Sequence, residues 1–126
     1  MKEQTSTTTT LVLGATPNPT RYAYLATERL LKHNHEVVLV GIKDGNIAGI
    51  PIIKGMEDPA TPIDTVTLNV GPKRQPPYYD YLMDLKPRRI IFNPGTENPE
   101  LVKLAKENDI EPIIACTLVM LATGEY

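Results

Sequence analysis

An apolar segment runs directly into a glycine turn and then into a helical pattern between Leu11 and Lys32. The aliphatic run ends at Leu13, Gly14 follows at once, and apolar residues then recur at helical spacing over 22–32. A strand, a glycine turn and a helix in this order bring backbone N–H groups and the positive end of a helix dipole together. This order is typical of the first βα turn of an α/β fold and indicates a binder of a phosphorylated nucleotide.

Short apolar runs recur along the chain and predict strands at 9–13, 36–40, 64–70, 88–92 and 111–115. Most of these runs are apolar almost throughout, as expected for strands that are covered on both faces of a parallel sheet. Helical patterns lie between them at 22–32, 77–86 and 98–108, and the last two have a proline near the start. Alternating strands and helices predict βαβ units with right-handed crossovers.

The region 44–62 is irregular in sequence, although Ile50 to Ile53 reads as a short third strand. Pro51 lies inside that run, which favours a position at the edge of the sheet. We therefore expect an α/β protein with a three-layer Rossmann-like fold. Its mostly parallel sheet would have five or six strands in the order 3-2-1-4-5. Residues 1–8 are expected to form a disordered polar N-terminus, and 9–126 a single domain.

Composition restricts the classes of partner. The net charge of −2 argues against nucleic acid and against an anionic membrane surface. A single cysteine excludes an internal disulfide framework, no secretory leader is visible, and no apolar run is long enough to span a bilayer. We expect a cytoplasmic protein whose partner is a small-molecule nucleotide. Whether it forms a homo-oligomer or binds a partner protein stays open.

The first turn supplies the main candidate site. Gly14 permits close backbone approach, and Asn18 or Thr20 is expected to cap the helix. Arg21 falls in the first helical turn, where a cation is unfavourable because it lies at the positive end of the helix dipole. A bound phosphate would offset this loss of stability. The G-x-G-x-x-G fingerprint is absent and two prolines remove N–H donors, which disfavours a pyrophosphate buried as in NAD enzymes.

Lys43 lies just after the second predicted strand, where an NAD site would have an acidic residue. A lysine there suits an additional ribose phosphate, as in NADP or coenzyme A. Asp44 follows directly, so that the sequence weakens the NAD interpretation without excluding it.

Two further strand ends are expected at the same crevice. Val70 and Pro72 would form an apolar wall for adenine or pantetheine. Lys73 and Arg74 could reach a phosphate, although exposed basic residues before a helix are more often solvated. The residues expected to bind the cofactor are Gly14, Ala15, Thr16, Pro17, Asn18, Pro19, Arg21, Lys43, Val70, Pro72, Asn93 and Gly95.

We expect neither a catalytic residue nor a metal ligand. His33 and His35 fall between the first helix and the second strand, at the amino end of the sheet and far from the crevice. Cys116 follows the last strand, on the crevice side, but the sequence shows no base or cation to activate its thiol. Tyr78, Tyr79 and Tyr81, near the start of the helix expected over 77–86, are interpreted as packing or interface residues.

The first turn resembles that of small single-domain CoA-binding proteins, which are related to the CoA-binding domain of the succinyl-CoA synthetase alpha subunit. The shared pattern is carried by Gly14, Ala15, Thr16, Pro19, Arg21 and Tyr24. The similarity extends to the glycine turn at 93–98 and to Cys116. It implies coenzyme A or an acyl-CoA as the ligand. The chain departs from the family pattern at 41–43 after the second strand and at 117–118 after the cysteine.

The resemblance and the residues together favour non-catalytic binding of coenzyme A or an acyl-CoA through the first βα turn. One alternative is an enzyme, either an NADP-dependent reductase or a CoA-ligase subunit that needs a partner chain. The other is an interaction protein with a degenerate nucleotide crevice, which the two departures from the family pattern favour.

Overall fold

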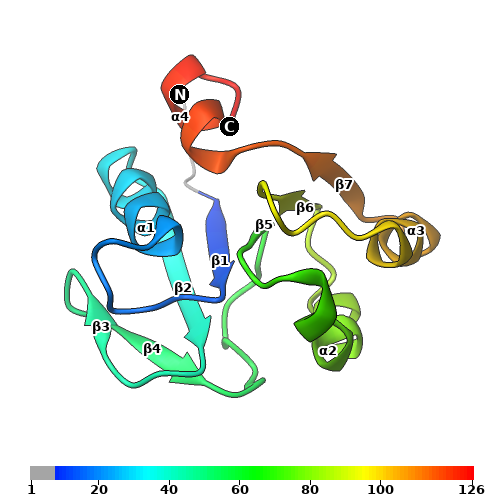
Figure 1. The fold of residues 1–126 in the computed structure, drawn as a ribbon, viewed down its shortest axis with the longest axis horizontal. Coiled ribbons are helices and arrows are strands. Elements are labelled where there is room, and N and C mark those ends of the chain that lie inside the picture. Colours follow the sequence, from blue (N-terminus) through cyan, green and yellow to red (C-terminus); the bar gives the residue numbers. More distant parts are fainter. Residues whose placement is uncertain (1–7) are drawn as a thin grey trace.

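The computed structural model describes residues 8–126, so the disorder expected for 1–8 falls almost wholly outside the described residues. One seven-stranded sheet runs through this part of the chain in the order β3-β4-β2-β1-β5-β6-β7 (Figure 1). The strands are β1 (Thr9–Leu13), β2 (Glu36–Gly41), β3 (Asn46–Ile47), β4 (Ile50–Lys54), β5 (Thr65–Leu68), β6 (Arg89–Phe92) and β7 (Glu111–Ile114). The helices are α1 (Tyr22–Lys32), α2 (Tyr79–Leu85), α3 (Pro99–Glu107) and α4 (Thr117–Thr123).

Neighbouring strands are parallel except for β3 and β4, which form an antiparallel pair. The predicted α/β class, mostly parallel sheet and strand order are confirmed. The sheet has seven strands rather than five or six. All six expected strands are present, and the two-residue β3, which no apolar run marks, is the seventh.

The edge position predicted for Pro51 is wrong. Its strand, β4, lies between β2 and β3. The parallel ladder between β2 and β4 begins only at the pair Leu39 and Ile52. Pro51 therefore precedes that ladder, and its missing N–H removes no hydrogen bond to β2.

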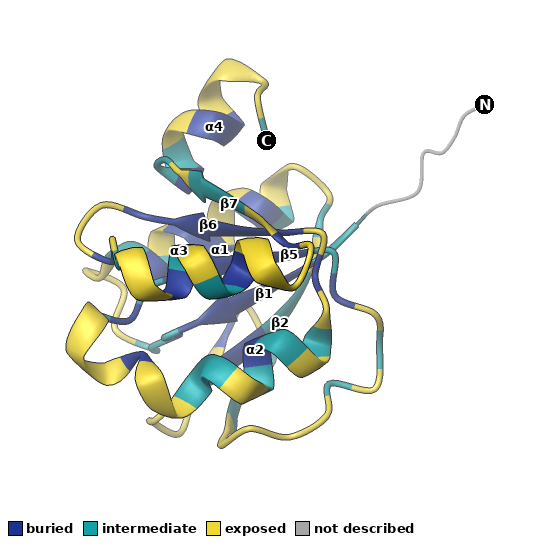
Figure 2. Ribbon diagram, turned by 90° about the vertical axis from the view of Figure 1, so that its right-hand side faces the viewer, coloured by how far each residue is buried: buried dark blue, intermediate teal, exposed yellow. Residues whose placement is uncertain are grey.

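Helices cover both faces of the sheet, as the right-handed crossover rule requires for a chain that builds outward from β1 in both directions (Figures 1 and 2). On one face, Leu82 of α2 and Leu101 of α3 pack against Leu68 and Phe92. On the other face, α1 and α4 pack against a second cluster around Val12. Alternate residues of β1 and of β2 belong to the two clusters, which explains why these two strands are largely apolar.

The edge strand β7 contains a proline, Pro112, at a position where the missing N–H removes no hydrogen bond to β6. Glu111 N donates to Arg88 O, and Ala115 N donates to Phe92 O. In a parallel ladder every second residue donates to the same neighbour, so Pro112 faces away from β6. None of the helices in residues 8–126 is long and apolar enough to cross a membrane.

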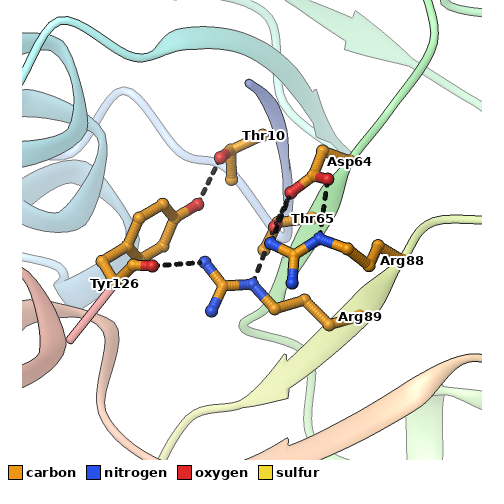
Figure 3. A network of polar contacts seen from close by, with 6 residues as sticks. All are labelled: Thr10, Asp64, Thr65, Arg88, Arg89 and Tyr126. Atoms are coloured by element: carbon orange, nitrogen blue, oxygen red, sulfur yellow. Dashed lines mark hydrogen bonds and ion pairs between the residues drawn. The ribbon is translucent and has the colours of Figure 1, made fainter. Parts of the chain in front are cut away.

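A polar network joins the C-terminal residue to the amino ends of the central strands (Figure 3). Arg89 is 5% exposed, and its Nε donates to Thr65 Oγ1 at 2.9 Å. Its Nη2 donates to the backbone oxygen of Tyr126 at 3.0 Å, and its guanidinium lies 4.5 Å from the centre of the Tyr126 ring. The Tyr126 hydroxyl is hydrogen-bonded to Thr10. This network lies at the end of the sheet opposite the first turn.

Candidate functional site

A cavity of about 690 Å³ lies at the carboxyl ends of β1, β2, β5 and β6. This is where parallel α/β sheets bind ligands, next to the point where the strand order reverses. Of the residues predicted to bind a cofactor, the structure brings together at this cavity Gly14, Ala15, Thr16, Pro17, Asn18, Arg21, Lys43, Val70, Asn93 and Gly95.

Pro19 and Pro72 were also predicted to bind the cofactor, but they are not among the residues that line the cavity. Both are exposed. Pro72 begins the 3-10 turn Pro72–Arg74, and the side chain that this turn contributes to the lining is Arg74.

Backbone contacts hold the first turn against its neighbouring strands. Gly14 N and Ala15 N both donate to Val40 O, at 2.9 and 3.0 Å. Gly14 has a φ of +95°, and a Cβ built there would lie 2.8 Å from Asn69 O. A Cβ on Gly41 would lie only 2.2 Å from Ala15 O. The turn is therefore fixed by β2 and β5, and two of its amides are already hydrogen-bonded within the protein.

The helix cap predicted for Asn18 or Thr20 is wrong. Asn18 Oδ1 accepts hydrogen bonds from Thr20 N at 3.0 Å and Thr20 Oγ1 at 2.8 Å, one turn before the helix. The N-cap of α1 is Arg21, in an extended conformation, and no side chain in the described part of the chain caps this helix. Because the local polar side chains bond to each other, the positive end of the eleven-residue helix is left without a capping side chain at the cavity.

Three cations line the cavity from three separate elements: Arg21 before α1, Lys43 after β2 and Arg74 in the segment after β5. All three are exposed, and no Asp or Glu is among the lining residues. Asp44 directs its carboxylate to Lys54, at 2.9 Å, and does not line the cavity. The charge balance at this site therefore favours an anion.

Asn93 lies at the carboxyl end of β6 and is 2% exposed. Its Nδ2 donates to Thr67 Oγ1 at 2.7 Å and to Leu68 O at 2.9 Å. Its Oδ1 accepts hydrogen bonds from the Tyr22 hydroxyl at 2.9 Å and from Thr117 N at 2.8 Å. The side-chain amide is thus fully engaged within the protein, so Asn93 shapes the cavity rather than offering a free polar group to it.

Tyr22 also lines the cavity, although it is not among the residues predicted to bind the cofactor. Its hydroxyl contacts Cys116 Sγ at 3.0 Å and accepts from Leu118 N at 3.3 Å, in addition to its bond to Asn93. Burial, reinforced by the hydrogen bond with Cys116, raises the pKa of Tyr22 to about 12. The signal in the sequence was its place at the first helical residue, which faces the carboxyl end of the sheet.

Cys116 is half-buried, and its thiol meets the hydroxyl of Tyr22. Because the pKa of Tyr22 is raised to about 12, this hydroxyl stays protonated near neutral pH and is not a base for the thiol.

His33 ends α1 and His35 precedes β2, at the amino end of the sheet as predicted. Within residues 8–126 no group of three or more His, Cys, Asp or Glu side chains could hold a metal ion.

The other tyrosines divide between packing and the cavity. Tyr78 lines the cavity and also packs against the core under α2 and α3. Tyr79 and Tyr81 pack against the same core. The Tyr79 hydroxyl donates to Glu100, and the Tyr81 hydroxyl donates to the backbone oxygen of Glu57.

A second hollow, of about 630 Å³, lies between α3 and β7. It is open and mostly apolar, and no residue predicted to bind a cofactor lines it.

Comparison with known proteins identifies a family and several similar structures. A family model described as a CoA binding domain matches residues 8–122. A crystal structure of an uncharacterized protein is 51% identical, with a TM-score of 0.93, and the match covers 96% of this chain and 99% of that one. A hypothetical protein from Pyrococcus horikoshii OT3 is 27% identical, with a TM-score of 0.79, over 91% of this chain and 81% of that one.

A more distant structure shares the fold alone. The dinucleotide-forming acetyl-coenzyme A synthetase 1 of Ca. Korarchaeum cryptofilum, in complex with phosphate and ADP, is 15% identical with a TM-score of 0.70. The match covers 86% of this chain but 25% of that one. No curated protein matches this chain at a significant level. The match of the family model over nearly all of the described residues shows that the chain belongs to the CoA binding domain family.

Proposed function

We propose that this protein binds coenzyme A or an acyl-CoA in the cavity at the first βα turn and does not by itself catalyse a reaction. The single observation that supports this best is the joint placement of three cations and the uncapped N-terminus of α1 around one cavity. An anionic ligand with several phosphates has a favourable interaction with each of these groups.

The proposed position of the ligand follows from where each cation lies. The pyrophosphate would lie against Thr16 to Asn18 and the first turn of α1, with Arg21 as its charged partner. Lys43, at the end of β2, would meet the ribose phosphate that distinguishes coenzyme A from dephospho-CoA. Val70 and Gly95 would line the path of the pantetheine chain. Gly14 and Ala15 would contribute shape rather than hydrogen bonds, because their amides already donate to Val40.

Thermal denaturation with a panel of ligands tests this proposal. The panel consists of CoA, acetyl-CoA, dephospho-CoA, NADP and NAD. A ligand at one hundred times its Kd stabilises a protein by about 2.7 kcal/mol, which such a measurement detects. We expect CoA to raise the melting temperature more than dephospho-CoA does, and we expect Lys43→Ala to remove that difference. Lys73→Ala is the matched control, because Lys73 is also exposed yet does not line the cavity.

The outcomes separate the alternatives. Equal shifts with CoA and dephospho-CoA would remove Lys43 from the proposed role. A larger shift with NADP or NAD would favour a dinucleotide-dependent reductase. No shift with any ligand would favour an interaction protein with a degenerate crevice.

Release of free thiol from acetyl-CoA tests the absence of catalysis. We expect none above the uncatalysed rate, because the nearest partner of Cys116 is a tyrosine hydroxyl that does not act as a base near neutral pH. Hydrolysis that Cys116→Ala abolished would contradict the proposal and identify the thiol as a nucleophile. Activity that appears only when a second protein is added would favour a CoA-ligase subunit.

A further inference from the structure

Gln75 is completely buried, although it lies in a segment whose other side chains are largely exposed. The segment connects β5 to α2 and contains two 3-10 turns, Pro72–Arg74 and Pro76–Tyr78, with Gln75 between them. A primary amide is costly to bury unless its donors and its acceptor are all satisfied. Its burial inside a surface segment therefore calls for a structural explanation.

The amide of Gln75 joins the two segments that form one wall of the cavity. Its Nε2 donates to Val70 O and to Thr96 O, each at 2.8 Å. Its Oε1 accepts from Asn98 Nδ2, also at 2.8 Å. Both partners of Nε2 are carbonyl oxygens, which accept only, so the chemistry of the site fixes which end of the amide is the donor. Every hydrogen-bonding group of the side chain has a partner.

The same wall carries side chains that face the ligand cavity. Val70, Arg74 and Tyr78 line it from the segment that contains Gln75, and Thr96 lines it from the turn after β6. The network continues outward, because Asn98 Nδ2 also donates to the hydroxyl of Tyr79 at 2.8 Å. Asn98 in turn caps α3 by accepting from the amide of Glu100. Loops of this length are commonly mobile, but here a buried amide links this one to a helix start.

We infer that Gln75 is a positioning residue that holds the segment 70–78 against the turn 93–98, so that Arg74 and Tyr78 are in place before a ligand binds. The role in ligand binding rests on the proposed function, whereas the preformed wall does not. A site that is ordered in the free protein loses less conformational freedom on binding, and the ordering raises affinity without adding a contact to the ligand.

Amide hydrogen exchange in the ligand-free protein tests the preformed wall. The amides of Arg74 and Tyr78 donate to Gly71 O at 3.0 Å and to Gln75 O at 2.8 Å, so they report whether the two turns are closed. We expect both amides to be protected in the wild type. In Gln75→Leu they should exchange at least tenfold faster, while those of β1 change less than twofold. Rapid exchange in the wild type, or no acceleration in the variant, would overturn the inference.

Two further variants keep this test decisive. Gln75→Glu has the same size and keeps an acceptor for Asn98, but it places an oxygen against Val70 O and Thr96 O. It should open the segment as Gln75→Leu does, and it stands in for that variant if Gln75→Leu does not fold. Tyr126→Phe removes a hydrogen bond at the opposite end of the sheet. It controls for general destabilisation and should leave the exchange of Arg74 and Tyr78 unchanged.

A double-mutant cycle with coenzyme A separates positioning from mere stabilisation. In the wild-type background we expect Arg74→Ala to weaken CoA binding at least fivefold. In the Gln75→Leu background the same change should weaken it less than twofold, because Arg74 is no longer held at the cavity. Equal effects in both backgrounds would overturn the positioning role. Protected amides together with no CoA binding by the wild type would instead refute the proposed ligand and leave the preformed wall intact.

Discussion

The hydroxyl of Tyr22 donates a hydrogen bond to Oδ1 of Asn93 at 2.9 Å, and this bond joins the start of α1 to the carboxyl end of β6 across the cavity. The two residues are 71 positions apart in the sequence. Both also bond to the first amides of α4, Asn93 to Thr117 N and Tyr22 to Leu118 N. Tyr22 and Asn93, which line the cavity, and the first two amides of α4 therefore form one hydrogen-bonded unit.

Tyr22→Phe should destabilise the protein by about 1–3 kcal/mol, the cost of leaving a buried polar group without its partner. The change leaves Leu118 N without its side-chain acceptor and removes one of the two donors to Asn93 Oδ1, while it keeps the ring. Urea denaturation measures the loss, and the amide of Leu118 should exchange faster. Tyr24→Phe is the control, because Tyr24 belongs to the same helix but its hydroxyl takes no part in this unit. Equal stability of the two variants would show that the unit contributes little.

The raised pKa of Tyr22 predicts a loss of stability in strong base. In the folded protein its pKa is about 12, against 10.0 for the free side chain, with burial as the main cause. The unfolded chain therefore loses this proton first, and the contribution to stability is complete below pH 10 and falls between pH 10 and about 12. Denaturation at intervals across this range should show a shallower decline for Tyr22→Phe than for the wild type.

Arg21→Ala should weaken the binding of CoA by about 1.5–3 kcal/mol, the range for a hydrogen bond to a charged group. Stability without ligand should be unchanged or slightly higher, because an exposed cation at the N-cap of α1 opposes the helix dipole. Calorimetric titration and thermal denaturation measure the two quantities. Arg29→Ala, in the last turn of the same helix, should leave binding unaffected. A large loss of stability in the free Arg21→Ala protein would mean that this arginine is structural.

Gly41→Ala should cost about 1–3 kcal/mol of stability, as overpacking against a fixed neighbour does. The new methyl group would meet the carbonyl oxygen of Ala15, which cannot withdraw easily because Ala15 N is bonded to Val40 O. Gly71→Ala is a matched control in the segment after β5, with a φ of −63° and no atom within 4 Å of the added carbon. Denaturation midpoints of the two variants should differ clearly, and similar midpoints would contradict the close approach.

Because His35 is half-buried, we predict that the protein loses stability in mild acid. Burial, together with the nearby charges of His33 and Arg89, lowers the pKa of His35 below its usual 6.5. The unfolded chain therefore takes up the proton first, and stability is complete above pH 6.5 and declines below it.

His35→Phe tests this dependence and retains a ring against Tyr126, whose centroid lies 4.8 Å away. Urea midpoints between pH 5 and 8 should fall less steeply for this variant than for the wild type. His33→Gln is the comparison, and it should retain most of the slope because burial, the main cause, is unchanged. An unaltered slope in His35→Phe would assign the dependence to another group.

Local patterns predicted most of the sheet and the first turn. The five apolar runs became β1, β2, β5, β6 and β7, since an uninterrupted aliphatic run has few other places to be buried. The glycine turn was also predictable, because strand, turn and helix are contiguous. The helix expected over 77–86 instead starts with 3-10 turns and becomes α-helical only at Tyr79, after the adjacent prolines.

Other features depend on contacts between distant parts of the chain. No helix was predicted over α4, and its N-cap, Cys116, supplies no side-chain cap. Its first amides are instead satisfied by Asn93 and Tyr22, which no local pattern could reveal. For the same reason the sequence did not show that Arg74 lines the cavity, since its position depends on the burial of Gln75.

The two outermost strands of the sheet have a consequence for behaviour at high concentration. An exposed strand with a full row of free amides is a template on which other chains can polymerise. Here one outer strand, β3, is two residues long, and the other presents Pro112 where an outward amide would stand. A second chain would find little backbone to extend from either side. The fold thus resists growth into fibrils through its own geometry, independently of whatever occupies the cavity.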